Sequence, residues 1–342
     1  MLKKLKEKGL ISTLKKGIKV TEKRLDFIKT EGGLSPIGKT SDDLLFVCAS
    51  FEPRTTTATE CLGKSYRAKN GLLYYNNSEA SSDIVKTNLE KLRRLLELKC
   101  DRVRTIEGSV NDPVKQFKAI KDAVLDIRAS NSFRAITIDS TTFNREALLV
   151  AMALIRTNHS SAMTRVLYVS PFKHGDWLSR GFREVRSIIG FPGIQRADQP
   201  TMLIVLSGFE PDRVTKIVEE HGPDKVLLGF GNPPTQQSFL ERNIEEQRKI
   251  VFSKQDVERF EFPANSIKAC HDCLESLLKD RLPSHNVIMA PMSTKLSTLG
   301  AFLTVEAHPE IQLTYCVPGE YNTQNYSQGA TSVFVEMISP KT

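Results

Sequence analysis

Apolar runs alternate with amphipathic segments along the chain from residue 44 onward. The run LLFVCAS at 44–50 stays apolar until its last position, as expected for a strand buried on both faces of a parallel sheet. The segment 82–98 instead spaces its Ile, Val and Leu residues as one stripe of a helix. The same patterns predict strands at 44–50, 71–75, 101–107, 134–139 and 164–170, and helices at 82–98, 112–129 and 144–158. This alternation predicts a parallel sheet covered by helices on both faces.

A second series of elements begins at residue 201 and repeats the order of the first. It comprises strands 201–208, 224–230, 257–262, 285–291 and 311–317, helices 211–221, 234–251, 265–281 and 294–308, and a last strand at 331–338. Corresponding elements lie at a nearly constant offset, strand 44–50 matching 201–207 and strand 134–139 matching 285–290. We therefore predict an α/β fold made of two tandem Rossmann-like domains that arose by internal duplication.

The pattern also predicts the domain limits. The first Rossmann-like domain covers 41–170 and the second covers 201–342. The segment 171–200 between them is polar, rich in glycine and contains the only Trp, so it is expected to connect the two. Residues 1–40 are expected to form a helical arm and a linker rich in Gly, Pro and Ser.

The positive charge of the chain is concentrated in this arm. The whole chain carries a net charge of +8, and residues 1–31 hold ten Lys or Arg against four Asp or Glu. Apolar residues recur there at helical spacing, which predicts a basic amphipathic helix. Its cations could be solvated on a helix that packs on its own protein, or could contact nucleic acid or an acidic partner. The candidate contacts are Lys3, Lys4, Lys6, Lys8, Lys15, Lys16 and Lys19.

The overall composition is that of an ordinary globular protein. The 342 residues include six scattered cysteines, which indicate reduced thiols rather than a disulfide framework. The basic N-terminus is not followed by the apolar region of a secretory signal, and no apolar run is long enough to span a membrane. We expect a cytoplasmic protein with no membrane partner. The pair Cys270 and Cys273 lacks the further ligands that zinc would need, so no metal is expected.

A Phe-Glu-Pro motif with a nearby arginine follows the first strand of each half. In open parallel sheets, ligands bind at the carboxyl ends of the strands, so the loops after the first and fourth strands are the candidate sites. Both kinds of loop place hydroxyl side chains and a cation just before a helix, where free N–H groups suit phosphate. The candidate residues are Ser50, Glu52, Arg54, Thr55, Asp139, Thr141, Thr142, Arg145, Ser207, Glu210, Arg213, Ser293, Thr294 and Lys295.

The same residue types have a purely structural explanation. Ser, Thr and Asp are the common N-caps of helices, and Arg54 or Arg213 could simply pair with Glu52 or Glu210. Recurrence at the same position in both halves favours a functional role. The polar loop 318–329 adds Tyr321 and Tyr326, which could stack on a base or could belong to a surface loop covering the end of the sheet.

Several known motifs are missing from the sequence. The dinucleotide fingerprint G-x-G-x-x-G follows neither first strand, and neither the P-loop nor the G-x-S-x-G motif occurs. We therefore expect no cofactor and favour a binding protein over an enzyme.

The segment APMSTKLSTLGAF at 290–302 suggests a family. Its loop with Ser293, Thr294 and Lys295, placed after a fourth strand, resembles the Gly-Thr-Lys loop of CARF domains (CRISPR-associated Rossmann fold). Two such units in one chain are similar to the fused SAVED arrangement of bacterial antiphage systems. The resemblance implies sensing of a cyclic oligonucleotide by the loops after strands 1 and 4. No effector segment is visible, so it also implies output through a partner such as an effector or ATPase.

Three functions are open at this point. The first is a nucleotide- or phosphate-sensing adaptor of a defence system that binds its ligand between the two halves. The second is an enzyme acting on a nucleotide or sugar phosphate, with Glu52, Glu210 or Asp139 as acid–base groups. The third is a scaffold subunit whose basic arm docks on nucleic acid or on an acidic partner.

Overall fold

The computed structural model describes residues 34–77, 83–128, 133–252 and 255–341. Of residues 1–33 it describes only the backbone of two short paired strands, β1 (Ser12–Thr13) and β2 (Ile18–Lys19). These four residues are extended rather than helical. The rest of the predicted basic helix lies outside the described residues, and so do the side chains of its seven candidate lysines.

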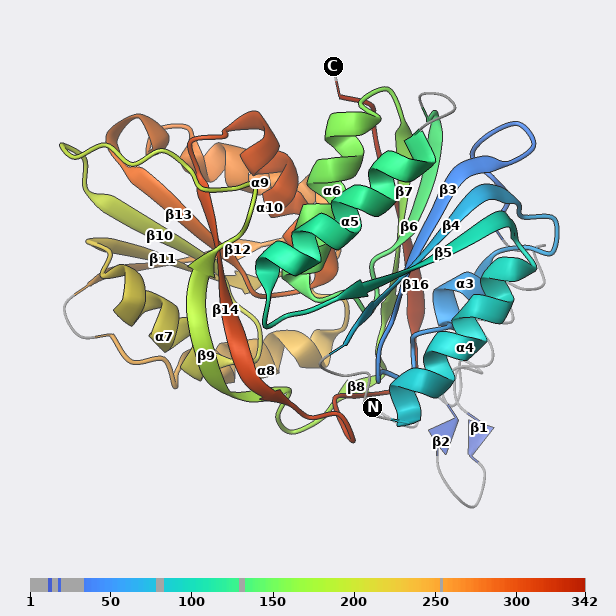
Figure 1. Cartoon of the computed structure of the whole chain (residues 1–342). Coiled ribbons are helices and arrows are strands. Elements are labelled where there is room, and N and C mark those ends of the chain that lie inside the picture. Colours follow the sequence, from blue (N-terminus) through green and yellow to red (C-terminus); the bar gives the residue numbers. More distant parts are fainter. Residues whose placement is uncertain are drawn as a thin grey trace.

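Two six-stranded sheets form the molecule, and each has five parallel strands in the order 3-2-1-4-5 (Figure 1). The first half contributes β3 (Asp42–Ala49), α3 (Thr57–Cys61), β4 (Ala68–Asn76), α4 (Asp83–Glu97), β5 (Cys100–Gly108), α5 (Pro113–Arg128), β6 (Ala135–Asp139), α6 (Arg145–Asn158) and β7 (Met163–Ser170). The second half contributes β10 (Thr201–Leu206), α7 (Pro211–His221), β11 (Lys225–Gly231), α8 (Gln237–Gln247), β12 (Asp256–Phe262), α9 (Ile267–Leu278), a 3-10 turn (Leu282–Ser284), β13 (Asn286–Pro291), α10 (Lys295–Ala307) and β14 (Gln312–Tyr321). The prediction of two Rossmann-like units with the same element order is confirmed.

The sixth strand of each sheet comes from the other half of the chain. After β7 the chain forms β8 (Lys173–His174) and then β9 (Ser179–Ser187), which pairs antiparallel with β14 of the second sheet. After β14 it forms β15 (Ser327–Gln328) and then β16 (Ser332–Ile338), which pairs antiparallel with β7 of the first sheet. The domain limits predicted from the sequence are therefore wrong at these two strands. β9 lies in the segment 171–200 that was expected only to connect the domains, and β16 was expected in the second domain but belongs to the first sheet.

The two crossing segments meet where they pass each other. We call residues 171–178 and 322–331 the strap segments, because they join each sheet to a strand of the other. β8 lies in the first strap segment and β15 in the second, and they pair antiparallel, His174 opposite Ser327 and Lys173 opposite Gln328. The exchange is thus reciprocal.

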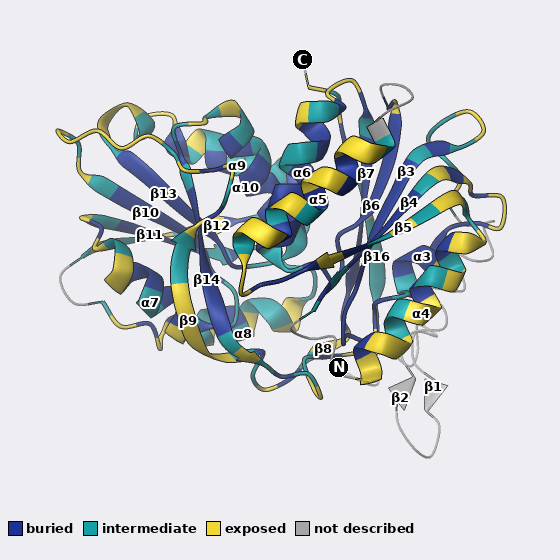
Figure 2. Ribbon diagram, viewed as in Figure 1, coloured by how far each residue is buried: buried dark blue, intermediate teal, exposed yellow. Residues whose placement is uncertain are grey.

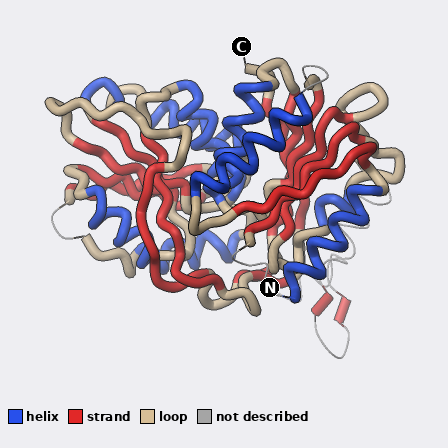
Figure 3. The backbone as a smooth tube through the Cα atoms, viewed as in Figure 1, coloured by secondary structure: helices blue, strands red, loops and turns tan. Residues whose placement is uncertain are grey.

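Helices lie between the sheets as well as outside them. Figure 3 shows helices in the space between the two sheets, and Figure 1 identifies them as α5, α6, α9 and α10. One continuous apolar core contains the inner faces of both sheets together with buried residues of these helices. The outer face of the first sheet packs under α3 and α4, and the outer face of the second sheet packs under α7. Figure 2 shows the central strands buried, and exposed positions on the edge strand β9 and on the outward faces of helices such as α4 and α5.

Local chemistry fixes the ends of the helices that matter for the site. The Asn144 side chain caps α6 by accepting a hydrogen bond of 2.7 Å from the Ala147 N–H, and Thr294 caps α10 by accepting one of 3.1 Å from the Ser297 N–H. Both caps place the next residue, Arg145 or Lys295, at the first helical position. No described helix is both long and apolar enough to cross a bilayer.

The shared core predicts that the two halves are stabilised together. Leu299 of α10 is fully buried in the core that contains both sheets, whereas Leu98, just after α4, is 72% exposed. We expect Leu299→Ala to lower the free energy of unfolding by about 2–5 kcal/mol and Leu98→Ala to change it by less than about 1 kcal/mol. Urea denaturation, followed by far-UV circular dichroism and by fluorescence of the single Trp177, measures both. Separate transitions for the two probes would contradict a common core.

Candidate functional site

The loops at the carboxyl ends of both parallel sheets meet at the interface between the two halves. The loops after the first strands, β3 and β10, and after the fourth strands, β6 and β13, converge there, and α6 and α10 begin there. These loops flank the points where strand order reverses in each sheet, the usual ligand position in open α/β sheets. The structure therefore brings together most of the residues predicted from the two kinds of loop.

The repeated Phe-Glu-Pro motif forms a buried ion pair in the first half. Glu52 pairs with Arg54, and a second guanidinium nitrogen of Arg54 donates to the Val169 carbonyl of β7. Ser327 of the strap donates a hydrogen bond of 2.8 Å to the same carboxylate. Burial alone would raise the pKa of Glu52, but the charges of Arg54 and Lys295 outweigh it and lower that pKa below its ordinary value. The pair thus ties the loop after strand 1 to strand 5 and to the strap.

The second half repeats this arrangement. The Arg213 Nη1 lies 2.8 Å from the Glu210 Oε2, and Nη2 donates to the carbonyl of Cys316 on β14. Ser179, just beyond the other strap segment, donates to Glu210. The charges of Arg213 and Arg145 lower the pKa of Glu210 against the effect of its burial. The Phe-Glu-Pro motif therefore makes the same contact in both halves. Of the two explanations considered for its Glu and Arg residues, the structure shows the pairing of each Glu with its own Arg.

Most of the predicted hydroxyl groups bind the backbone. Thr142 donates to the Cys48 carbonyl at 2.7 Å, and Ser207 donates to the Gly229 carbonyl at 2.8 Å. Thr141 accepts from the Val169 N–H at 3.1 Å. Ser50 accepts from the N–H of Glu52 at 3.1 Å, and Thr55 donates to the Ser50 carbonyl at 3.3 Å. These side chains shape the loops, and of the five only Thr141 lines the larger cavity described below, with Ser50 and Thr142 lining the smaller one.

Asp139 lies at the end of β6 and is buried. Its carboxylate accepts a hydrogen bond of 3.0 Å from the Thr141 N–H. Burial raises the pKa of Asp139 to about 6, although this hydrogen bond and the charge of Arg54 act in the opposite direction. Asp139 borders neither cavity and is a structural residue of the loop.

The cationic side chains at the starts of α6 and α10 each reach from their own half toward the other half. Arg145 begins α6, and its Nη2 donates to the carbonyls of Met292 and Ser293 in the opposite loop at 2.7 and 2.6 Å. Lys295 begins α10, and it lies near Glu52 and Arg54 of the first half. Carbonyl groups are neutral, so the charge of Arg145 is not compensated by its hydrogen bonds. Since Glu52 and Glu210 each pair with their own arginine, neither Arg145 nor Lys295 has a carboxylate partner of its own among the described residues.

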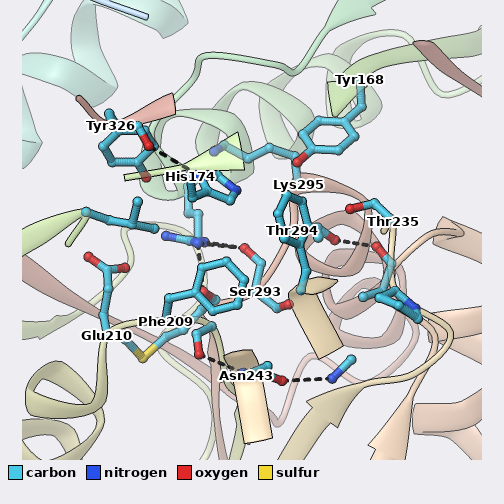
Figure 4. Close-up of a pocket in the computed structure, with 18 of the residues that line it drawn as sticks. Tyr168, His174, Phe209, Glu210, Thr235, Asn243, Ser293, Thr294, Lys295 and Tyr326 are labelled. Atoms are coloured by element: carbon cyan, nitrogen blue, oxygen red, sulfur yellow. Dashed lines mark hydrogen bonds between the residues drawn. The ribbon is translucent and has the colours of Figure 1, made fainter. Parts of the chain in front are cut away.

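Two adjacent cavities, which we call the larger and the smaller lobe, lie in the interface and share four lining residues. The larger lobe has a volume of about 70 Å³ and the smaller of about 40 Å³, and Glu52, Arg145, Lys295 and Tyr326 border both. Figure 4 shows the labelled side chains of Lys295, His174 and Tyr326 gathered at one side of the larger lobe. Ser293 and Thr294, both predicted from the sequence, also line this lobe.

Aromatic rings form the remaining wall of the larger lobe. His174 lies with its ring centroid 5.4 Å from that of Phe209 and 5.0 Å from that of Phe239. Burial and the charge of Arg54 lower the pKa of His174 to about 3, so this ring is neutral at pH 7. Sequence reasoning missed His174, Phe239 and Tyr168, because strap, helix and strand positions give no local sign that they will meet. Phe209 is part of the repeated Phe-Glu-Pro motif, so the sequence did contain a signal for this residue.

The two predicted tyrosines lie at different depths. Tyr326, in a strap segment, lines both lobes and packs its ring 5.7 Å from that of Phe51. Tyr321, at the end of β14, packs 5.9 Å from the Phe51 ring and borders only the smaller lobe. Both are thus wall residues of the interface rather than parts of an exposed loop.

Metal ligands do not gather in the described parts of the chain. No group of three or more His, Cys, Asp or Glu side chains there is placed to hold a metal ion. Cys270 is buried in the core and Cys273 donates to the Glu261 carbonyl at 3.4 Å.

Comparisons with known proteins add little to this picture. No family model and no curated protein matches the chain. Solved structures that match include an N-terminal ketoreductase from the macrolactin assembly line, which is 10% identical with a TM-score of 0.20, the match covering 84% of this chain and 69% of that one. A similarity at that score carries no argument about fold or function. The fold assignment rests on the order of the strands.

The ion pair of the first half predicts a strong dependence of stability on both partners. Arg54→Met leaves Glu52 buried with its main partner removed, and we expect a loss of about 3–5 kcal/mol in the free energy of unfolding. Adding Glu52→Gln to this variant removes the uncompensated charge and should recover part of the loss. Urea denaturation of the two single variants and the double variant gives the coupling energy. A double variant that loses the sum of the two single effects would show that the two side chains do not act as a pair.

The raised pKa of Asp139 predicts that replacing its carboxyl group by an amide increases the stability of the protein in a pH-dependent way. Asp139→Asn keeps the oxygen that accepts from Thr141 but cannot ionise. The contribution of Asp139 to the stability of the wild-type protein falls as pH rises from about 4 to 6, because the unfolded carboxyl ionises before the folded one. The variant should therefore equal wild type near pH 4 and exceed it by up to about 3 kcal/mol above pH 6. Thermal melts between pH 4 and 7.5 test this, and a variant that is less stable throughout would contradict it.

Proposed function

We propose that this protein binds a phosphate-bearing ligand of the nucleotide class in the cavity between its two halves, and that it acts as a sensor or adaptor through a partner protein. One observation carries the proposal: Arg145 and Lys295 bring to the same cavity two cationic side chains, neither of which forms an ion pair with a described carboxylate. Every carboxylate that borders the cavity already has its own arginine. An anion is the ligand that such a surface favours.

The helix ends strengthen this preference. α6 and α10 both begin at the cavity, and each N-terminus contributes a partial positive charge and free N–H groups. Ser293 adds a hydroxyl group from the loop after strand 4, whereas the Thr294 hydroxyl already donates to the Ala264 carbonyl at 2.6 Å. The aromatic wall of His174, Phe209 and Phe239 offers ring faces on which a nucleobase can stack.

The size of the cavity bears on how a ligand enters. A water molecule needs roughly 10–15 Å³ of such space, so a lobe of about 70 Å³ holds a few waters or a group of the size of a phosphate. A whole nucleotide requires that the wall move. The strap segments would be the part that moves, since His174, Leu178 and Tyr326 of these segments line the larger lobe. Because each strap segment continues into a strand of the opposite sheet, a displacement there would reach the outer edges at β9 and β16.

The resemblance to CARF and SAVED domains supports the class of ligand and the need for a partner. The loops expected to sense the ligand are the loops after strands 1 and 4, and both kinds border the cavity. The defence role and the identity of the partner belong to this proposal. Binding is favoured over acid–base catalysis because Glu52 and Glu210 are held ionised by their arginines.

Ligand affinity should depend on pH through Lys295. Burial and the charges of Arg145 and Arg54 lower the pKa of Lys295 to about 7, so its positive charge is lost as pH rises above 7. We expect the affinity for a phosphodiester nucleotide to fall above pH 7 by at most about tenfold per pH unit. A phosphodiester is the right probe because phosphate monoesters themselves titrate near pH 6.

Calorimetric titration with linear and cyclic phosphodiester nucleotides between pH 6 and 8.5 measures this dependence. Lys295→Met should weaken binding at least about tenfold at pH 6.5 and remove the dependence on pH. Lys121→Met, which changes an exposed lysine of α5 away from the cavity, is the matched control and should bind as wild type does. Absence of heat with every nucleotide, or equal binding by Lys295→Met, would refute the proposal.

A further inference from the structure

Lys295 has surroundings that are unusual for a lysine. Its side chain is partly buried and borders both lobes of the cavity (Figure 4). No described atom accepts a hydrogen bond from its amine. The charged and titratable groups that influence the amine or line the larger lobe with it come from both halves: Cys48, Glu52, Arg54, Arg145, Tyr168, His174, Glu210 and Tyr326.

This environment disfavours the protonated amine. Burial is the largest cause, and the neighbouring charges of Arg145 and Arg54 act in the same direction, while Glu52 opposes them. The pKa of Lys295 is therefore lowered to about 7, so about half of the amines carry a free lone pair at neutral pH. Desolvation and adjacent cations are the two conditions that turn a lysine into a nucleophile.

The duplication has produced only one such group. Arg145 occupies the corresponding first position of α6, and a guanidinium is always protonated and cannot attack a carbonyl. Arg145 also has its hydrogen bonds fixed to the carbonyls of Met292 and Ser293, so it can attract an anion but not react. The interface thus pairs one fixed cation with one available amine.

We propose that Lys295 is a reactive amine that forms an imine with an aldehyde carried on an anionic small molecule in the interdomain cavity. The amine nitrogen attacks the aldehyde carbon and forms a carbinolamine. Loss of the oxygen as water, with the two protons of the amine, gives the carbon–nitrogen double bond. No oxidant or reductant takes part. The anionic part of this inference rests on the proposed function, since Arg145 and the N-terminus of α10 would hold it.

Reductive trapping tests the inference on the full chain. The protein is mixed with pyridoxal 5′-phosphate at pH 7, sodium cyanoborohydride reduces any imine to a stable secondary amine, and peptide mass mapping locates the label. We expect Lys295 to be labelled first and at least tenfold faster than the exposed Lys173. The rate should rise with pH to a plateau, with a midpoint near 7. Labelling of exposed lysines with Lys295 unmodified would overturn the inference.

Two variants separate reactivity from folding. Lys295→Arg keeps the positive charge, and it should lose the fast label. Lys173→Arg should keep it. If Lys295→Arg does not fold, the peptide map of the wild-type protein still decides the question.

Two further comparisons separate this inference from the proposed function. Pyridoxal without its phosphate should label Lys295 more slowly than pyridoxal 5′-phosphate, and the phosphodiester ligand should protect Lys295. Equal rates with the two aldehydes would support the reactive amine but overturn its anion subsite. Nucleotide binding without fast labelling at Lys295 would leave the proposed function standing and overturn this inference.

Discussion

The buried pair of glutamate and arginine, present once in each half, is the interaction on which the interface depends. Each arginine neutralises the glutamate beside it and also binds a carbonyl of strand 5, so one side chain fixes the loop after strand 1 against the neighbouring strand. The carboxylates in turn accept from Ser327 and Ser179, next to or within the crossing segments. Because these charges are satisfied internally, they leave Arg145 and Lys295 as the cations that a ligand can meet. The electrostatic character of the cavity is thus a consequence of how the loops are held.

The exchange of the sixth strands turns two similar domains into one body. Each domain completes its sheet with a strand from the other, and a common core joins the inner faces of both sheets. The cavity lies between the halves and is covered by the segments that carry the exchange. A ligand that moved these segments would therefore act on both sheets at once.

Much of the fold could be predicted from the sequence because buried parallel strands are continuous apolar runs. β3 and β10 show this pattern, and the recurrence of Phe-Glu-Pro after each indicated the duplication. β9 was missed because an exposed edge strand with arginines at Arg180, Arg183 and Arg186 has no apolar pattern to detect. β16 was recognised as a strand, but the sheet that it joins could not be predicted, because the sequence pattern does not say which strands pair in space.

The candidate site was predicted in part for the same reason. The sequence indicated Lys295 and Tyr326, whereas only the folded structure brings His174 and Phe239 next to them. The hydroxyl residues were placed correctly in the loops, yet most bind the backbone, because a short side chain before a helix meets the chain's own N–H and carbonyl groups first.

The central claim is that the interface between the two halves is a site for an anion held at Lys295. A crystal structure of the protein soaked with tungstate, an oxyanion that is located by its anomalous scattering, tests this most directly. The account predicts an anomalous peak in the interdomain cavity within hydrogen-bonding distance of the Lys295 amine, and none beside Arg213, whose charge is already used. Tungstate bound elsewhere on the surface with that cavity empty would contradict it.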